Sequence, residues 1–265
     1  MSSEGQRTLF DLFYSGQHDK VLEAHQADPD GEWSDADLHV VFASASALDW
    51  DLAELPGRLP NPIDAQHFWD LFDRQLDDEI VGERVGLLQQ PVHLHKSVLA
   101  AAIGLRAGKR NFVETGTYIG QSLLMISGLF DRLATVEADP VLHTASVRLF
   151  AAKGVENVEL ALGDSRSFLA GIERDFGNDS VYFLDAHYSH GITSREYGTC
   201  PVIDEIATVI DRSPEAVIVV DDLRTMSGSD GYPTLDEILN SIPNSRRVSI
   251  AYDQVIIKKG AVLDL

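Results

Sequence analysis

Cysteine is nearly absent from this sequence. Its 265 residues include one cysteine, Cys200, which excludes an internal disulfide bond. A chain of this length buries a substantial core without disulfides, and a single thiol suits a reducing compartment. The sequence also has no apolar run long enough to cross a bilayer and no signal-peptide pattern. We therefore expect a cytoplasmic protein that has no membrane partner.

Positive charge is scarce as well. The chain has 21 Lys and Arg residues against 42 Asp and Glu residues, a formal net charge of -21. Such a protein repels nucleic-acid phosphates and anionic lipids, so neither is expected as a partner. The acids are most concentrated in residues 1–95, where 19 Asp and Glu residues stand against 5 Lys and Arg residues. A solvated acidic surface is a simpler explanation of this excess than a dedicated basic partner.

Residues 1–95 carry helical patterns and no motif that we can name. Short helices are expected over residues 8–14 and 20–25, and a longer helix after an N-cap at Ser34. A proline-rich break follows, and a further helix is expected to begin at Asp64. We interpret this accessory region as a lid that shapes an acceptor pocket or as the dimerisation element of a homo-oligomer.

From residue 96 onward, apolar runs typical of strands alternate with helical patterns. This alternation predicts an α/β domain over residues 96–265, with a doubly wound parallel sheet and right-handed crossovers. The last two strands, expected at 247–252 and 254–258, are joined too tightly to be parallel and should form an antiparallel hairpin. The other five strands are expected at 111–114, 133–137, 155–162, 181–185 and 216–221.

The stretch from Asn111 to Ser122 joins a strand to a helix through a glycine turn and reads Asn-Phe-Val-Glu-Thr-Gly-Thr-Tyr-Ile-Gly-Gln-Ser. Parallel sheets bind ligands at such a strand end, because glycine lets the backbone approach and the helix start offers unpaired N–H groups. Glu114 adds a negative charge, which argues against a polyphosphate and for a ligand with an ammonium group or hydroxyls. The alternative is a tight turn in a nicotinamide-binding or ligand-free sheet, although the Gly-x-Gly-x-x-Gly fingerprint of dinucleotide sites is missing.

The pattern Glu-x-Gly-x-Tyr-x-Gly-x-Ser resembles the first motif of class I S-adenosylmethionine-dependent methyltransferases. It is most similar to the catechol O-methyltransferase-like and macrocin-type sugar O-methyltransferase branches, and the similarity covers about residues 96–260. The resemblance implies a seven-stranded Rossmann-like methyltransferase sheet with a C-terminal antiparallel hairpin, following an N-terminal helical extension. It also implies S-adenosylmethionine as the cofactor. The hairpin expected from the strand pattern supports the resemblance independently of the glycines.

The resemblance assigns the cofactor contacts to neighbouring strand ends. Glu137, followed by Ala138, ends the second strand, where an acid can accept hydrogen bonds from both ribose hydroxyls. Asp164 and Ser165 end the third strand beside the adenine, and Asp185 ends the fourth. The methionine part is assigned to Glu114, Thr115, Gly116, Thr117, Tyr118, Gly120 and Ser122.

Carboxylates also follow two strands that should be adjacent, with Asp185 after one strand and Asp221 and Asp222 after the next. Three such charges repel one another unless a proton is shared or a divalent cation binds, and oxygen ligands favour Mg²⁺, Mn²⁺ or Ca²⁺ over zinc. The resemblance agrees, because metal-dependent O-methyltransferases hold Mg²⁺ at the matching positions. In the alternative, Asp221 caps a helix and Asp222 lies in solvent.

His187 and Tyr188 follow Asp185 closely. An imidazole can accept the proton of an acceptor hydroxyl or complete a metal shell, and a purely structural role is the alternative. The catechol-type pattern has a lysine base three residues after the first metal-binding Asp, where this chain has Tyr188. Asp185, His187 and Tyr188 are therefore the candidate catalytic residues.

Taken together, these patterns predict an S-adenosylmethionine-dependent methyltransferase that acts on a hydroxyl of a small-molecule acceptor, such as a sugar, a polyol or a specialised metabolite. A divalent metal is expected to assist it. Two alternatives stay open. One is metal-independent N-methylation or an intramolecular displacement that uses the aminobutyrate chain of the cofactor. The other is a binding protein that kept the fold and lost catalysis.

Overall fold

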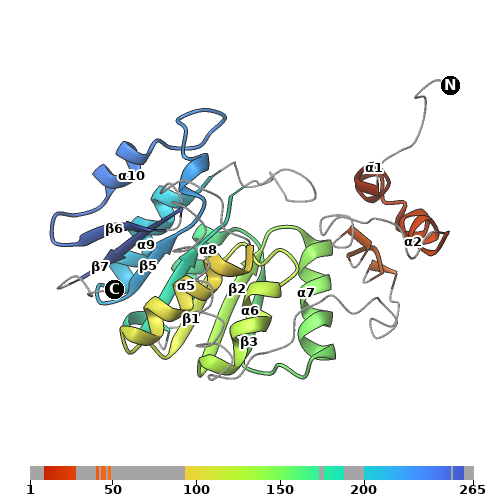
Figure 1. The fold of residues 1–265 in the computed structure, drawn as a ribbon, viewed down its shortest axis with the longest axis horizontal. Coiled ribbons are helices and arrows are strands. Elements are labelled where there is room, and N and C mark those ends of the chain that lie inside the picture. Colours follow the sequence, from red (N-terminus) through yellow and green to blue (C-terminus); the bar gives the residue numbers. More distant parts are fainter. Residues whose placement is uncertain are drawn as a thin grey trace, which may run out of the picture.

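The computed structural model describes residues 9–27, 40–41, 43–45, 47–48, 93–172, 176–187, 200–251 and 253–259. Figure 1 shows these residues as an α/β body with a smaller group of N-terminal helices at one side. No helix in the described residues is both long and apolar enough to cross a membrane. The helix expected after Ser34 is described only in part, and the one expected after Asp64 lies outside the described residues.

A single seven-stranded sheet forms the centre of the body, in the order β3-β2-β1-β4-β5-β7-β6. The first five strands are parallel, and β7 is antiparallel to both of its neighbours, β5 and β6. This arrangement confirms the doubly wound sheet and the C-terminal hairpin. The strands are β1 (Asn111–Thr115), β2 (Arg132–Glu137), β3 (Val158–Leu162), β4 (Ser180–Leu184), β5 (Val217–Val220), β6 (Arg247–Ala251) and β7 (Gln254–Lys258).

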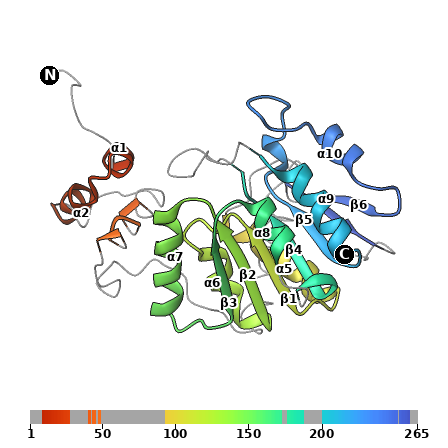
Figure 2. The same cartoon turned by 180° about the vertical axis from the view of Figure 1, so that it is seen from behind.

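Helices cover both faces of the sheet. Figures 1 and 2, which view the molecule from opposite sides, show α5, α6 and α7 over one face and α8 and α9 over the other. Buried residues of α10 join the core on the side of α8 and α9. The helices are α5 (His93–Arg106), α6 (Gln121–Ile126), α7 (Pro140–Ala152), α8 (Ser165–Gly171), α9 (Val202–Arg212) and α10 (Leu235–Ser241).

The core has two layers because successive residues of a strand point to opposite faces. On β1, Phe112 packs into the layer under α5, α6 and α7, while Val113 packs into the layer under α8 and α9. On β4, Phe183 and Tyr182 divide in the same way. Strands buried on both faces explain the continuous apolar runs of the sequence, such as Val217–Val220.

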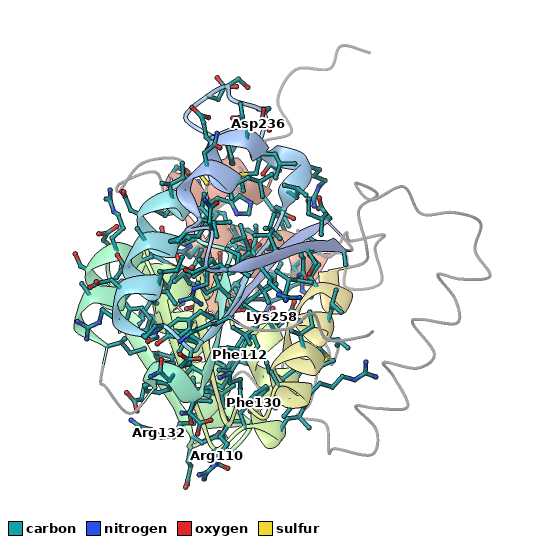
Figure 3. The ribbon with its side chains drawn as sticks, turned by 90° about the vertical axis from the view of Figure 1, so that its left-hand side faces the viewer. Arg110, Phe112, Phe130, Arg132, Asp236 and Lys258 are labelled. Carbon is teal, nitrogen blue, oxygen red and sulfur yellow. The ribbon has the colours of Figure 1, made fainter. Side chains whose placement is uncertain are left out.

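The two ends of the sheet differ in chemistry. Figure 3 shows Arg110 and Arg132, at the amino ends of β1 and β2, at one extremity of the molecule, with Phe112 and Phe130 just inside. These arginines pair with Asp131 and Glu159 across exposed salt bridges. The opposite end, where β1, β2, β4 and β5 finish, carries the acids predicted from the sequence. The strand order reverses between β1 and β4, and ligands of open α/β sheets bind at such a switch point.

The N-terminal helices α1 (Leu9–Tyr14) and α2 (His18–Ala27) confirm the two short helices expected there. Phe13 and Val21 belong to the same hydrophobic cluster as the layer under α5, α6 and α7. Burial lowers the pKa of His18, and the charges of Asp19 and Asp139 oppose that shift. Helix α2 therefore lies near the start of α7, on the β2 side of the sheet (Figure 1).

Candidate active site

The turn between β1 and α6 depends on its two glycines. Gly116 and Gly120 have φ values of 86° and 80°, a left-handed conformation that other residues rarely adopt. A Cβ atom at Gly116 would lie 2.6 Å from the backbone oxygen of Asp185, and one at Gly120 would lie 2.8 Å from Cε2 of Phe150. The glycines therefore let the turn pack against the end of β4 and against α7. Tyr118, between them, also has a positive φ of 53°.

Glu114 is a buried acid at the end of β1. Its side chain is 2% exposed, and its Oε2 atom has no hydrogen-bond partner among the described residues. Burial raises the pKa of Glu114 well above its usual value, and the charges of Asp185, Glu137 and Asp221 add to the rise. These four carboxyl groups, from the ends of β1, β4, β2 and β5, form what we call the acidic edge.

Glu137 ends β2 and fixes the turns on both sides of the expected ribose position. Its Oε2 atom accepts a hydrogen bond from the N–H of Tyr118 at 2.7 Å, and its Oε1 atom accepts one from the N–H of Asp139 at 2.9 Å. Burial raises its pKa to about 7, although these backbone bonds work in the opposite direction. The carboxylate thus connects the glycine turn to the N-cap of α7, where Asp139 accepts from Val141 N–H at 2.8 Å.

The other expected cofactor residues surround these two acids. Thr117 shares a 2.6 Å hydrogen bond with Thr135, and the Oγ1 atom of Thr115 accepts from Asp185 N–H at 3.3 Å. Ser122 is partly exposed in the first turn of α6, and Ala138 is partly exposed beside Glu137. On the adenine side, Asp164 caps α8 by accepting from Ser167 N–H at 3.3 Å, and Ser165 is buried. The structure therefore brings the predicted cofactor residues to one edge of the sheet.

His187 lies between two of the predicted metal-binding carboxylates. Its Nδ1 atom is 3.2 Å from Oδ1 of Asp185, and its Nε2 atom is 3.0 Å from Oδ2 of Asp222. Asp222 has a left-handed backbone conformation with φ 55°. One ligand atom from each of these three residues lies within 4.8 Å of the others, a grouping that can hold a metal ion.

Asp221 points away from that group. Its Oδ1 atom accepts from the side-chain amide of Gln254 at 3.2 Å, and its Oδ2 atom is 3.0 Å from Nζ of Lys96. Lys96 also pairs with Oδ1 of Asp222 and lies 3.8 Å from Asp253. Burial and the charge of Asp185 raise the pKa of Asp221 to about 7, while Lys96 and Gln254 lower it. The carboxylates after β5 are thus neutralised by a lysine that the sequence reasoning missed.

Arg224 adds a second cation. It pairs with Oδ1 of Asp222 at 2.5 Å and with the fully buried Asp253. Both of these partners are acids, so the guanidinium group contributes to the neutralisation of the carboxylates after β5. Tyr188, the remaining candidate catalytic residue, lies outside the described residues.

Comparison with known proteins gives a structural likeness without a sequence match. No protein-family model matches this chain. No curated protein sequence matches it either. Among solved structures, the O-methyltransferase TomG of Streptomyces achromogenes, involved in tomaymycin synthesis and bound to S-adenosylmethionine, is 17% identical, with 71% of this chain and 89% of TomG covered and a TM-score of 0.48.

Two further solved structures are similar to the same extent. PaMTH1, a methyltransferase of Podospora anserina bound to S-adenosylhomocysteine, is 17% identical with a TM-score of 0.48, and the match covers 74% of this chain and 87% of PaMTH1. An O-methyltransferase of Bacillus cereus in complex with S-adenosylhomocysteine is also 17% identical, with a TM-score of 0.46 and coverages of 74% and 90%.

At these identities and scores, the fold assignment rests on the sheet itself. Its strand order is β3-β2-β1-β4-β5-β7-β6, and β7 runs antiparallel between β5 and β6. The chain has a seven-stranded Rossmann-like methyltransferase sheet with a C-terminal antiparallel hairpin. In this methyltransferase fold, the acidic edge and the glycine turn lie together at the switch point between β1 and β4.

Proposed function

We propose that this protein is an S-adenosylmethionine-dependent methyltransferase. The acidic edge is the observation that carries the proposal, because burial and then the charges of Asp185, Glu137 and Asp221, at three neighbouring strand ends, raise the pKa of Glu114. A ligand that brings positive charge relieves this repulsion, whereas a ligand rich in phosphate increases it. S-adenosylmethionine carries a sulfonium and an ammonium group, so its charge is of the required sign.

Individual groups of the cofactor have matching partners at this edge. The Oε2 atom of Glu114, which has no partner in the described part of the chain, is a candidate acceptor for the ammonium group. The two oxygens of Glu137 accept the N–H groups of Tyr118 and Asp139, and a carboxylate has about four lone-pair sites, so Glu137 can also accept a ribose hydroxyl. The carboxylate of Glu137 is already fixed by its hydrogen bonds to the backbone of both neighbouring turns, so little conformational entropy is lost when a ligand binds.

We propose a small-molecule hydroxyl as the methyl acceptor. In this reaction the hydroxyl oxygen attacks the methyl carbon, a C–O bond forms while the S–C bond breaks, and S-adenosylhomocysteine leaves. The hydroxyl proton needs a base, and the imidazole of His187, which lies between the carboxylates of Asp185 and Asp222, is our candidate. His187 is the base in the metal-free form of this proposal; where a metal binds, His187 is a ligand instead, because a coordinated imidazole has no free lone pair to accept the proton.

A divalent metal fits the same group of residues. Asp185, His187 and Asp222 would hold it, and it would supply a lower pKa for an acceptor hydroxyl bound beside it. Two carboxylates and one imidazole suit Mn²⁺ as well as Mg²⁺, because the nitrogen ligand is softer than oxygen. Asp221, the third ligand implied by the resemblance, would have to leave Lys96 or Gln254 to join this set.

A second candidate function follows from Lys96 and Arg224. These cations already pair with Asp222, so part of the charge that a metal would neutralise is neutralised by the protein. That observation favours metal-independent chemistry, such as methylation of an amine. The two candidates differ in one respect that is easily measured, the loss or retention of methyl transfer after chelation of metals.

The proposed function is tested by calorimetric titration of S-adenosylmethionine and S-adenosylhomocysteine into EDTA-treated protein, with and without Mn²⁺ or Mg²⁺. We expect micromolar binding that is weakened at least about tenfold by Glu137→Ala, because the ribose loses its acceptor. Glu156→Ala, a change of an exposed glutamate in the loop before β3, is the matched control and should bind like wild type. Absence of binding under every condition would refute the methyltransferase proposal.

The second assay measures methyl transfer from labelled cofactor to a panel of sugars, polyols, phenols and amines. Turnover of hydroxyl compounds that is lost in EDTA and restored by Mn²⁺ or Mg²⁺ supports metal-assisted O-methylation. Turnover of amines that persists in EDTA supports the second candidate. Cofactor binding without turnover of any compound in the panel would favour the binding-protein alternative.

A further inference from the structure

Glu205 is a buried acid that the proposed reaction does not use. It lies in the first turn of α9, is 1% exposed, and shares the buried side of the helix with Val202, Ile206 and Val209. Its side chain is hydrogen-bonded to the side chains of Ser165 and Thr115. Within the described part of the chain, its Oε1 atom has no hydrogen-bond partner. An acid in this position has a large desolvation cost, which packing alone does not explain.

The two hydroxyl groups that meet Glu205 belong to different strand ends. Thr115 is the last residue of β1, and Ser165 is the first residue of α8, directly after β3. Both are among the residues assigned to the cofactor. Glu205 therefore joins the methionine side of the expected cofactor position to its adenine side, from a helix that is remote from both in the sequence.

Thr115 extends this connection to the end of β4. Its Oγ1 atom accepts a hydrogen bond from Asp185 N–H at 3.3 Å. A hydroxyl has one proton and can accept and donate at the same time, so its O–H is available to donate to the carboxyl of Glu205. The resulting chain runs from Asp185 through Thr115 to Glu205 and on to Ser165. It connects the loop of the proposed base and metal ligands to the loop beside the adenine.

We propose that Glu205 is a positioning residue that holds the ends of β1, β3 and β4 in the geometry required for cofactor binding. The acceptor oxygen of the side chain is the essential feature, because both hydroxyls converge on it. Burial raises the pKa of Glu205 to about 7, and a neutral carboxyl still accepts these bonds. The effect on cofactor affinity rests on the proposed function, whereas the effect on the loops does not.

Two substitutions of similar length separate this role from simple packing. Glu205→Gln keeps an acceptor oxygen, while Glu205→Met fills the space without one. Asp211→Asn, at an exposed position of the same helix, is the control. In ligand-free protein, we expect Glu205→Met to shift the amide NMR signals of residues 164–167 and 185–187 and to accelerate their hydrogen exchange about tenfold. Glu205→Gln and Asp211→Asn should leave both segments close to wild type.

The affinity for S-adenosylhomocysteine provides the second readout. Glu205→Met should weaken binding about tenfold without lowering the melting temperature, because removal of a buried acid offsets the lost hydrogen bonds, and Glu205→Gln should restore binding. Unchanged exchange in both loops of Glu205→Met would overturn the inference whether or not the cofactor binds. Absence of cofactor binding by the wild-type protein would instead overturn the proposed function, and the exchange measurement would still decide the role of Glu205.

Discussion

The ammonium nitrogen of Lys96 lies 3.0 Å from Oδ2 of Asp221, and both side chains are almost completely buried. Lys96 comes from the first turn of α5 and Asp221 from the end of β5, so the pair connects the helix that precedes the sheet to its fifth strand. The same ammonium group pairs with Asp222. One lysine therefore sets the charge of the aspartates after β5 and the direction in which Asp221 points.

Lys96→Met should destabilise the protein strongly, because it leaves buried aspartates without their cation. We expect the free energy of unfolding, measured by urea denaturation at pH 7, to fall by about 3–5 kcal/mol. Lys259→Met removes the lysine of an exposed pair with Glu215 and should cost less than about 1 kcal/mol. The double variant Lys96→Met with Asp221→Asn should recover part of the loss. A loss in Lys96→Met as small as that in Lys259→Met would contradict this account.

The divergent directions of Asp221 and Asp222 lead to a prediction about metal binding. Asp222→Asn should weaken Mn²⁺ binding at least about tenfold, because one oxygen of Asp222 belongs to the group formed with Asp185 and His187. Asp221→Asn, the neighbouring and chemically identical change, should alter the affinity much less, since Asp221 is turned to Lys96 and Gln254. Electron paramagnetic resonance of added Mn²⁺ measures both. Equal losses would show that Asp221 is a ligand, and no binding by wild type would refute the metal proposal.

Local sequence patterns predicted the sheet well because the central strands β4 and β5 are short apolar runs and the other strands alternate regularly with helical segments. The predicted ends of the strands were less accurate where side chains bond to residues that are distant in the sequence. Strand β3 begins at Val158 and not at 155, because Gly154 ends α7 with φ 67° and the amide of Asn157 bonds the carbonyl oxygens of Ser127 and Phe130. Helix α5 begins at His93, which brings Lys96 into its first turn.

The sequence predicted the acidic residues of the site, but it did not predict the residues with which they pair. Strand ends locate Glu114, Glu137 and Asp185 from the sequence, since parallel strands finish at one edge. The directions of Asp221 and Asp222 depend on Lys96, which only tertiary packing brings near them. Glu205 did leave a signal, an acid on the apolar side of an amphipathic helix between Val202 and Ile206. An acidic residue on the apolar side of a helix indicates that its side chain is hydrogen-bonded within the core.

The glycine turn gives a prediction about stability that needs no ligand. Gly120→Ala places a Cβ atom 2.8 Å from the ring of Phe150 at a positive φ, so strain and overpacking combine. We expect a loss of about 2–4 kcal/mol in the free energy of unfolding. Gly154→Ala has a similar φ of 67° and no atom within 4 Å of the added carbon, so it isolates the backbone strain at roughly 1 kcal/mol. Equal losses in the two variants would show that the ring of Phe150 moves aside without lowering the free energy of unfolding.

The buried acids predict that the ligand-free protein loses stability as the pH rises. Burial raises the pKa of Glu137 and of Glu205 from 4.5 to about 7, so the folded state binds protons that the unfolded state has released. The free energy of unfolding therefore falls between about pH 4.5 and 7 and levels off above that range, by roughly 3 kcal/mol for each group.

Urea denaturation at pH 5, 6, 7 and 8 measures this slope. Glu205→Gln should make the slope shallower but not abolish it, because the amide does not titrate and Glu137 still does, while Glu156→Gln at an exposed position should leave it unchanged. Stability that rises from pH 5 to pH 8 in the wild-type protein would contradict the prediction. A cationic ligand binds the ionised edge best, so saturating S-adenosylmethionine should reduce the fall more than S-adenosylhomocysteine, which lacks the sulfonium charge. The difference between the two cofactors would then measure how strongly the acidic edge responds to positive charge.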